Sequence, residues 1–105
     1  MRKKGVQPGI SVPKDKIAEF CQKYHITKLS LFGSVLGKDF RPESDIDVLV
    51  EFEPDHIPGL ALITIQEELS EILGGRKVDL VTLKFLNRRI RNKVESEAVI
   101  QYAQR

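Results

Sequence analysis

Residues 45–52 place the tightest limit on the fold of this chain. Two sets of residues alternate along the segment: Ile46, Val48, Val50 and Phe52 in one set, and Asp45, Asp47, Leu49 and Glu51 in the other. This two-residue period is typical of a strand with two distinct faces, because successive side chains of a strand point to opposite sides. The sequence therefore predicts a β-sheet in which one strand carries two acidic side chains on the same face.

Three other segments have the apolar spacing of an amphipathic helix. They are the segment that Pro13 opens, with Ile17, Phe20, Cys21 and Tyr24 on one face; the segment with Leu62, Ile65, Leu69, Ile72 and Leu73, which Gly74 and Gly75 end; and residues 85–95, with Leu86, Ile90 and Val94 pointing inward. A short helical turn is expected after Gly33 and Ser34.

Further strands are predicted at residues 28–32, at residues 77–83 and at residues 98–102, where Val99 and Ile100 favour a strand over a continued helix. Helices that alternate with strands predict an α/β or α+β fold, in which helices pack over a mixed β-sheet.

The length of 105 residues is that of one domain. We expect a flexible basic arm at residues 1–10 and a single domain at residues 11–105. The apolar stretches are too short to cross a bilayer, and the basic start is not followed by an apolar signal core. Because Cys21 is the only cysteine, it cannot form an internal disulfide. These features predict a cytoplasmic protein without membrane contact.

The charged residues are unevenly distributed along a chain whose formal net charge is +2. Acidic residues gather at positions 43–55 and basic residues at positions 84–93. Carboxylates that are close together repel one another unless cations offset them, so the acidic segment suggests a bound metal or a basic partner, with a solvated loop as the alternative. The basic segment is interpreted as an exposed helix surface, with a contact to phosphates or to an acidic protein face as the alternatives.

Asp45 and Asp47 form the centre of a candidate metal site. Two positions apart on a strand, their carboxylates lie about 6.6 Å apart along one face. A divalent cation would relieve their repulsion, and such hard oxygen ligands favour Mg²⁺ or Mn²⁺. Asp79, inside the apolar segment 78–81, is the candidate third carboxylate. Three carboxylates can hold two metal ions roughly 3.5–4 Å apart, one for the attacking hydroxyl and one for the leaving pyrophosphate, with Asp79 accepting the hydroxyl proton.

Gly33 and Ser34 follow the predicted strand at residues 28–32 and are candidates for holding a triphosphate. Glycine lets the backbone approach a ligand closely, and free amide groups at the start of a helical turn attract phosphate oxygens. Taken singly, a Gly-Ser pair is usually an ordinary turn, and an Asp in a strand is often a surface residue. The combination is much rarer than its parts.

These motifs resemble the nucleotidyltransferase superfamily of the DNA polymerase β type. Phe32, Gly33 and Ser34 are followed after ten residues by the run from Asp45 to Val50, and later by Val78, Asp79, Leu80 and Val81. Within the superfamily the chain resembles, over about residues 14–102, the minimal nucleotidyltransferases, which pair as antitoxins with HEPN-domain ribonuclease toxins. The resemblance implies a nucleotidyltransferase fold.

The resemblance also implies roles for individual residues. Gly33 and Ser34 match the phosphate-holding pair, Asp45 and Asp47 match the metal ligands, and Asp79 matches the third carboxylate. The chain departs from the family at Gly37 and Lys38, where many members carry Arg-Gly. A triphosphate contact is therefore expected from Lys38 or Arg41, although Arg41 could equally be a plain surface arginine.

The implied activity is the Mg²⁺-dependent transfer of AMP from ATP to a hydroxyl, with release of pyrophosphate. The expected acceptor is a tyrosine of a HEPN toxin, with no direct contact to nucleic acid, and a domain of this size would need a partner to complete the site. Two alternatives remain: a non-catalytic antitoxin that binds its toxin, and transfer to a small molecule with a helper subunit. The three acids favour catalysis, because a binding protein has no physical reason to keep them around an empty site.

Other interpretations of the motifs are excluded or disfavoured. A phosphate-binding P-loop is excluded because the glycine-to-lysine spacing is one residue short and Asp39 stands where Ser or Thr is needed. His25 and His56, at a predicted helix end and in a turn, lack a partner at ligand spacing and are expected to be surface residues. Neither follows an arginine at the spacing that the resemblance would require of a ribonuclease toxin.

Overall fold

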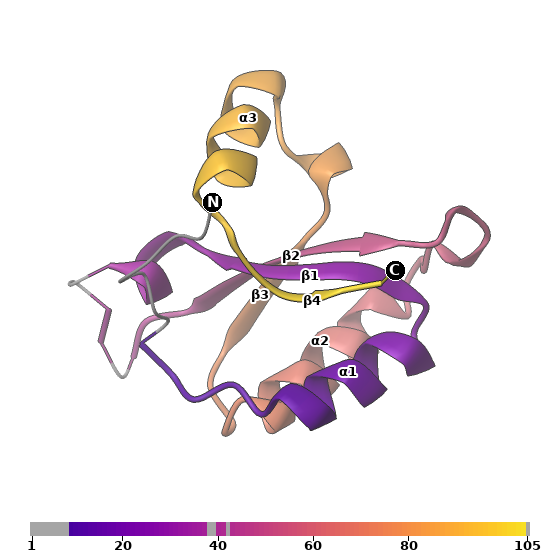
Figure 1. Ribbon diagram of the computed structural model, residues 1–105, viewed down its shortest axis with the longest axis horizontal. Helices are drawn as coiled ribbons and strands as arrows, with labels where there is room; N and C mark the ends of the chain where they lie inside the picture. The colour runs from indigo at the N-terminus through magenta and orange to yellow at the C-terminus, as the bar shows by residue number, and fades with distance from the viewer. Residues whose placement is uncertain (1–8, 38–39, 42, 105) are drawn as a thin grey trace.

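A computed structural model describes residues 9–37, 40–41 and 43–104, apart from the side chain of Phe85. The helices are α1 (Lys14–Lys23), α2 (Leu62–Ile72) and α3 (Arg88–Glu97), and the strands are β1 (Ile26–Phe32), β2 (Ile46–Phe52), β3 (Val78–Val81) and β4 (Val99–Ala103). Single 3₁₀ turns occur at η1 (Gly33–Leu36), η2 (Pro54–His56) and η3 (Leu83–Phe85). Figure 1 shows their arrangement.

The described strands form one mixed sheet in the order β3-β2-β1-β4. β1 pairs antiparallel with both β2 and β4, while β2 and β3 run parallel. The parallel pair is connected through α2, as a parallel connection requires a crossover. The prediction of a mixed sheet with helices packed over it is confirmed.

The hydrophobic core lies between the sheet and the helices α1 and α2, which cover the same face (Figure 1). Its members from α1 and α2 include Ile17, Phe20, Cys21, Ile65 and Leu69, and those from β1 and β2 include Leu29, Leu31, Val48 and Val50. Because side chains alternate along a strand, the intervening residues of β1 and β2 face the other side of the sheet, where α3 stands. We call this second side the α3 face.

Several element boundaries differ from the sequence prediction. β1 begins at Ile26, two residues earlier than expected, and β3 ends at Val81, because Leu83 starts the turn η3. The last helix begins only at Arg88, since the side chain of Asn87 accepts a hydrogen bond from the amide of Ile90 and caps the helix there.

The inward face of this last helix was predicted only in part. Val94 is buried, but Ile90 is 47% exposed, so the prediction that it points inward is wrong. The helix stands away from the sheet (Figure 1) and buries only its C-terminal part. The strand predicted at residues 98–102 is confirmed as β4.

Residues 1–8 of the predicted N-terminal arm lie outside the described residues. The amide of Gly9 donates a hydrogen bond of 2.8 Å to the carbonyl oxygen of Val35, and Ile10 packs partly buried against the core. In the part of the chain that the structure describes, no helix is long and apolar enough to cross a membrane.

Candidate active site

Asp47 and Asp79 stand opposite each other on the parallel strands β2 and β3. The residues that flank them, Ile46 with Val78 and Val48 with Leu80, are paired in the same register and are buried in the core. Because neighbouring side chains of a strand point to opposite faces, both carboxylates project onto the α3 face. The sheet therefore brings two of the three predicted acids together.

Asp45 lies immediately before β2. The amide of Ile46 donates a hydrogen bond of 2.8 Å to the carbonyl oxygen of Lys77, which fixes the backbone here against the start of β3. The side chain of Asp45 is exposed, and its Oδ2 lies 3.9 Å from Nζ of Lys77. Both groups are open to water, so this ion pair offsets little of the local negative charge.

The pKa of the Asp47 carboxyl is raised, first by burial and then by the negative charges of Asp79 and Asp45. All three effects disfavour the ionised form, and the positive charge of a divalent cation held between the acids would outweigh them. The three carboxylates are not all within 4.8 Å of one another, as expected of like charges that repel. Their hard oxygen atoms fit Mg²⁺ or Mn²⁺, so Asp45, Asp47 and Asp79 are suited to hold such ions.

Gly33 packs directly against Asp47. Phe32, the last residue of β1, pairs with Asp47, and Gly33 then turns the chain with a φ of 77° into η1. A Cβ built on Gly33 would collide with Oδ2 of Asp47. The position therefore requires glycine on two grounds, its backbone conformation and the lack of space.

Ser34, the second residue of the predicted phosphate-holding pair, is exposed at the start of η1. The turn is anchored by Val35, which is buried, and closed by a hydrogen bond of 2.9 Å from the amide of Gly37 to the carbonyl oxygen of Ser34. The pair Gly33–Ser34 thus lies beside the carboxylate of Asp47 with its hydroxyl open to a ligand.

Arg41 is fixed through its backbone. Its amide donates to Oγ of Ser44 at 3.1 Å, and its carbonyl oxygen accepts a hydrogen bond of 2.6 Å from Nη2 of Arg76. Its side chain is exposed, and within the described residues its guanidinium forms no ion pair with the three acids. Lys38, the other candidate for a triphosphate contact, lies outside the described residues.

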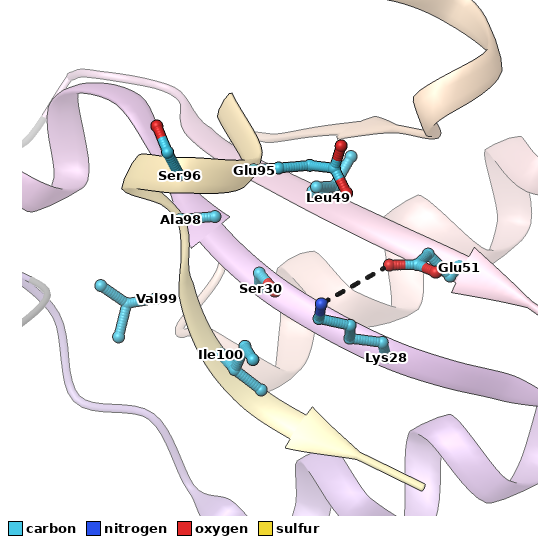
Figure 2. A pocket seen from close by; sticks show the side chains of 9 residues that line it. All are labelled: Lys28, Ser30, Leu49, Glu51, Glu95, Ser96, Ala98, Val99 and Ile100. Atoms are coloured by element: carbon cyan, nitrogen blue, oxygen red, sulfur yellow. Dashed lines mark ion pairs between the residues drawn. The ribbon is translucent and has the colours of Figure 1, made fainter. Parts of the chain in front are cut away.

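A cavity of about 620 Å³ opens on the α3 face beside the candidate site. Figure 2 shows its lining residues: Lys28, Ser30, Leu49, Glu51, Glu95, Ser96, Ala98, Val99 and Ile100. Lys28 and Glu51 form an ion pair of 3.9 Å across the strands, and Ser30 is almost fully buried. The three acids do not line the cavity, but Leu49 is two residues from Asp47 on the same face of β2, about 7 Å along the strand.

His25 and His56 are both partly exposed, as the sequence predicts, but the expected lack of a partner is wrong. His25 and His56 stack with ring centroids 3.6 Å apart, and Nδ1 of His25 lies 3.3 Å from Oε2 of Glu53. The antiparallel pairing of β1 with β2, which places Ile26 opposite Phe52, brings these distant residues together. Spacing along the sequence carries no signal of that pairing.

The sequence matches the family described as "Polymerase beta, Nucleotidyltransferase" over residues 15–104. Since this match spans most of the chain, the protein belongs to that family and is a nucleotidyltransferase. The family is the one that the motifs at Gly33–Ser34 and Asp45–Asp47 resemble, so that prediction is confirmed.

More specific similarities point to the minimal nucleotidyltransferases. The protein adenylyltransferase MntA of Thermococcus cleftensis is 35% identical over 81 residues, covering 77% of this chain and 80% of MntA. A solved structure described as a "putative minimal nucleotidyltransferase" superimposes with a TM-score of 0.69 at 30% identity, over 82% of this chain and 86% of that one. The MNT antitoxin complex with tri-AMPylated HEPN toxin of Shewanella oneidensis shares the fold, with a TM-score of 0.62 at 22% identity over 87% of this chain and 70% of that one.

Proposed function

We propose that this protein is an antitoxin that transfers AMP from ATP to a tyrosine hydroxyl of a HEPN ribonuclease toxin in the cytoplasm. The observation that carries the proposal is the opposed pair Asp47 and Asp79, with Gly33 packed against Asp47. The relative MntA is named a protein adenylyltransferase, and an antitoxin of the same fold forms a complex with an AMPylated HEPN toxin. Both similarities support a protein acceptor.

The reaction needs a divalent metal, and the three acids would hold it. Two Mg²⁺ ions, or Mn²⁺ in their place, would be bound by Asp45, Asp47 and Asp79 and would neutralise the negative charge of the triphosphate and of the leaving pyrophosphate. The raised pKa of Asp47 supports this role, because burial and the negative charges of Asp79 and Asp45 disfavour the ionised form of its carboxyl. Gly33 and the hydroxyl of Ser34 would hold the phosphates, with Arg41 as a further cationic contact.

The transfer step uses Asp79 as the proton acceptor. The tyrosine oxygen forms a bond to the α-phosphorus of ATP, the bond from that phosphorus to the bridging oxygen breaks, and pyrophosphate leaves. The hydroxyl proton passes to the carboxylate of Asp79, which is more exposed than that of Asp47 and so is accessible to an acceptor that approaches the α3 face.

The cavity on the α3 face supports a polypeptide acceptor. It opens to solvent between α3, β4, β1 and β2, the strand that carries Asp47, and it has both apolar walls, Leu49 and Ile100, and charged ones, Lys28 and Glu51. An extended segment of a partner lying in it would reach toward Asp47 and Asp79 along the same face of β2.

The test is a transfer assay with the protein encoded by the neighbouring gene. The purified chain, ATP and Mg²⁺ should add the mass of AMP to that protein, and the double variant Asp45→Asn with Asp47→Asn should abolish the addition. Asp15→Asn, which removes an exposed acid from α1 on the other side of the sheet, is the matched control and should retain activity. If the double variant neutralises the toxin fully while the toxin's mass stays unchanged, the protein acts by binding alone and the proposal fails.

A further inference from the structure

We propose that His25, Glu53 and His56 bind a divalent transition-metal ion of the zinc type, at the end of the sheet opposite the candidate active site. The chain has only two histidines, and both belong to this cluster. Each of the three side chains offers a ligand atom, and these atoms lie within 4.8 Å of one another. Among the described residues, no other group of three His, Cys, Asp or Glu side chains is gathered so closely.

The backbone holds the three residues next to one another. His25 precedes β1 and Glu53 follows β2, and the amide of Glu53 donates a hydrogen bond of 2.9 Å to the carbonyl oxygen of His25. The turn η2 is closed by a second hydrogen bond of 2.9 Å, from the amide of His56 to the carbonyl oxygen of Glu53. Asp47 lies at the other end of β2, five residues before Phe52 or about 17 Å along the strand, so the two sites are separate.

The carboxylate of Glu53 faces both imidazoles. Its Oε2 lies 3.3 Å from Nδ1 of His25, and its Oε1 lies 4.0 Å from Nδ1 of His56. Ligand atoms around a tetrahedral zinc ion are about 3.3 Å apart, given metal–ligand distances near 2.0 Å. All three side chains are partly exposed, so the imidazole rings can turn out of their stacked arrangement to point toward one ion, and water can complete the coordination.

The backbone of His25 supports a role for its side chain. Its φ of 58° makes it the one non-glycine residue of the described chain with a positive φ, directly after the end of α1. Glycine adopts a positive φ after a helix at the lowest conformational cost. Two glycines follow α2 in this conformation, Gly74 with a φ of 88° and Gly75 with a φ of 82°. A histidine in place of glycine carries a conformational cost, and a ligand role for the imidazole accounts for it.

The ligand types decide which metal the cluster would select. Two imidazoles and one carboxylate, with a coordination position left open, suit zinc and its transition-metal neighbours. Mg²⁺ prefers oxygen ligands only, as offered by Asp45, Asp47 and Asp79. The protein would therefore separate two classes of divalent ion between the two ends of β2.

Proton NMR of the tag-free protein tests the site directly, because the spectrum contains the imidazole signals of only two histidines, and both belong to the proposed site. We expect Zn²⁺ to shift the signals of both rings together until one equivalent is bound, and Mg²⁺ at the same concentration to leave them unchanged. A shift of only one ring, or a dissociation constant weaker than about 1 mM, on the order of 4 kcal/mol of binding, would overturn the proposal.

Variants separate this site from the acids of the active site. Glu53→Gln should weaken Zn²⁺ binding by at least about tenfold, the lower limit expected even for residues that only support a metal ligand. His25→Asn should do the same, and asparagine tolerates a positive φ, so the fold is retained. In Glu51→Gln and Asp47→Asn, Zn²⁺ should shift the histidine signals as it does in the parent protein. Equal Zn²⁺ affinity in Glu53→Gln and the parent protein would overturn the proposal and leave Glu53 as a hydrogen-bond partner of His25 alone.

Discussion

The carboxylates of Asp47 and Asp79 are directly opposed across the parallel strands β2 and β3, with no cationic side chain between them in the described ion pairs. Like charges placed opposite each other in a sheet destabilise it, and here burial adds to the cost by raising the pKa of Asp47. The folded protein thus retains an unfavourable interaction that a bound divalent cation would relieve.

Neutralising one of these acids should therefore stabilise the metal-free protein. Asp79→Asn is expected to raise the free energy of unfolding in EDTA by about 0.2–1 kcal/mol, because it removes the repulsion between the opposed charges. Mg²⁺ should stabilise the parent protein more than this variant. Urea unfolding with EDTA and with Mg²⁺ measures both effects. Glu67→Gln, an exposed acid of α2, is the control, and a loss of stability of Asp79→Asn in EDTA would contradict the explanation.

Gly33→Ala should be costly because it combines backbone strain with a collision. The positive φ alone costs about 1–2 kcal/mol for a residue with a Cβ, and the new Cβ would also displace the carboxylate of Asp47. Gly74→Ala isolates the first contribution, since Gly74 has a φ of 88° with open space around it. Chemical denaturation should show a larger loss for Gly33→Ala than for Gly74→Ala, and AMP transfer should be lost only in Gly33→Ala. Equal losses of stability in the two variants would mean that the collision with Asp47 adds nothing to the destabilisation.

The sequence predicts the strand around Asp47 well, but not the partner of that strand. Alternation from Ile46 to Phe52 shows which residues share a face, whereas the register with β3 depends on side chains that come together only in the fold. A slip of one residue would turn Asp79 to the other face. The same limit explains Ile90, whose helical spacing is regular but whose helix packs against the sheet only near Val94.

The cluster of His25, Glu53 and His56 was missed for a related reason. Glu53 and His56 are close in sequence, but His25 reaches them only because β1 and β2 pair antiparallel. Hydrophobic patterns predict that strands exist, and the identity of neighbouring strands determines which polar side chains meet. Sites built across strands are therefore harder to predict than motifs such as Gly33–Ser34, which lie on one continuous segment.

Cys21 should be unreactive in the folded protein. Its side chain is fully buried, and burial raises the pKa of its thiol to about 12, so almost no thiolate is present at pH 8. Labelling with a thiol reagent should be at least about a thousandfold slower in buffer than in denaturant, since a stability of roughly 5 kcal/mol or more limits exposure. Ser11→Cys, at an exposed position, is the positive control. Fast labelling of native Cys21 would show that α1 opens easily.

Tyr24 and Glu68 connect α1 to α2 and should make stability depend on pH. The hydroxyl of Tyr24 donates a hydrogen bond of 2.6 Å to Oε1 of Glu68, and this bond, with a weaker one from Lys23, lowers the pKa of the Glu68 carboxyl. A carboxyl whose pKa is lower in the folded state contributes stability above its ordinary value near 4.5 and loses that contribution as the pH falls through the lower folded value.

Tyr24→Phe should therefore lower the free energy of unfolding at pH 7 by about 1 kcal/mol, and the difference from the parent protein should shrink toward pH 3. The estimate lies below the usual value for a hydrogen bond to a charged group because Glu68 keeps about a third of its side chain exposed. Urea unfolding at both pH values measures the difference. Tyr102→Phe makes the same chemical change at a tyrosine without a side-chain hydrogen bond in the described structure, and should show no such pH dependence. A loss in Tyr24→Phe that is equal at pH 7 and pH 3 would place the effect in packing against Phe20 rather than in the bond to Glu68.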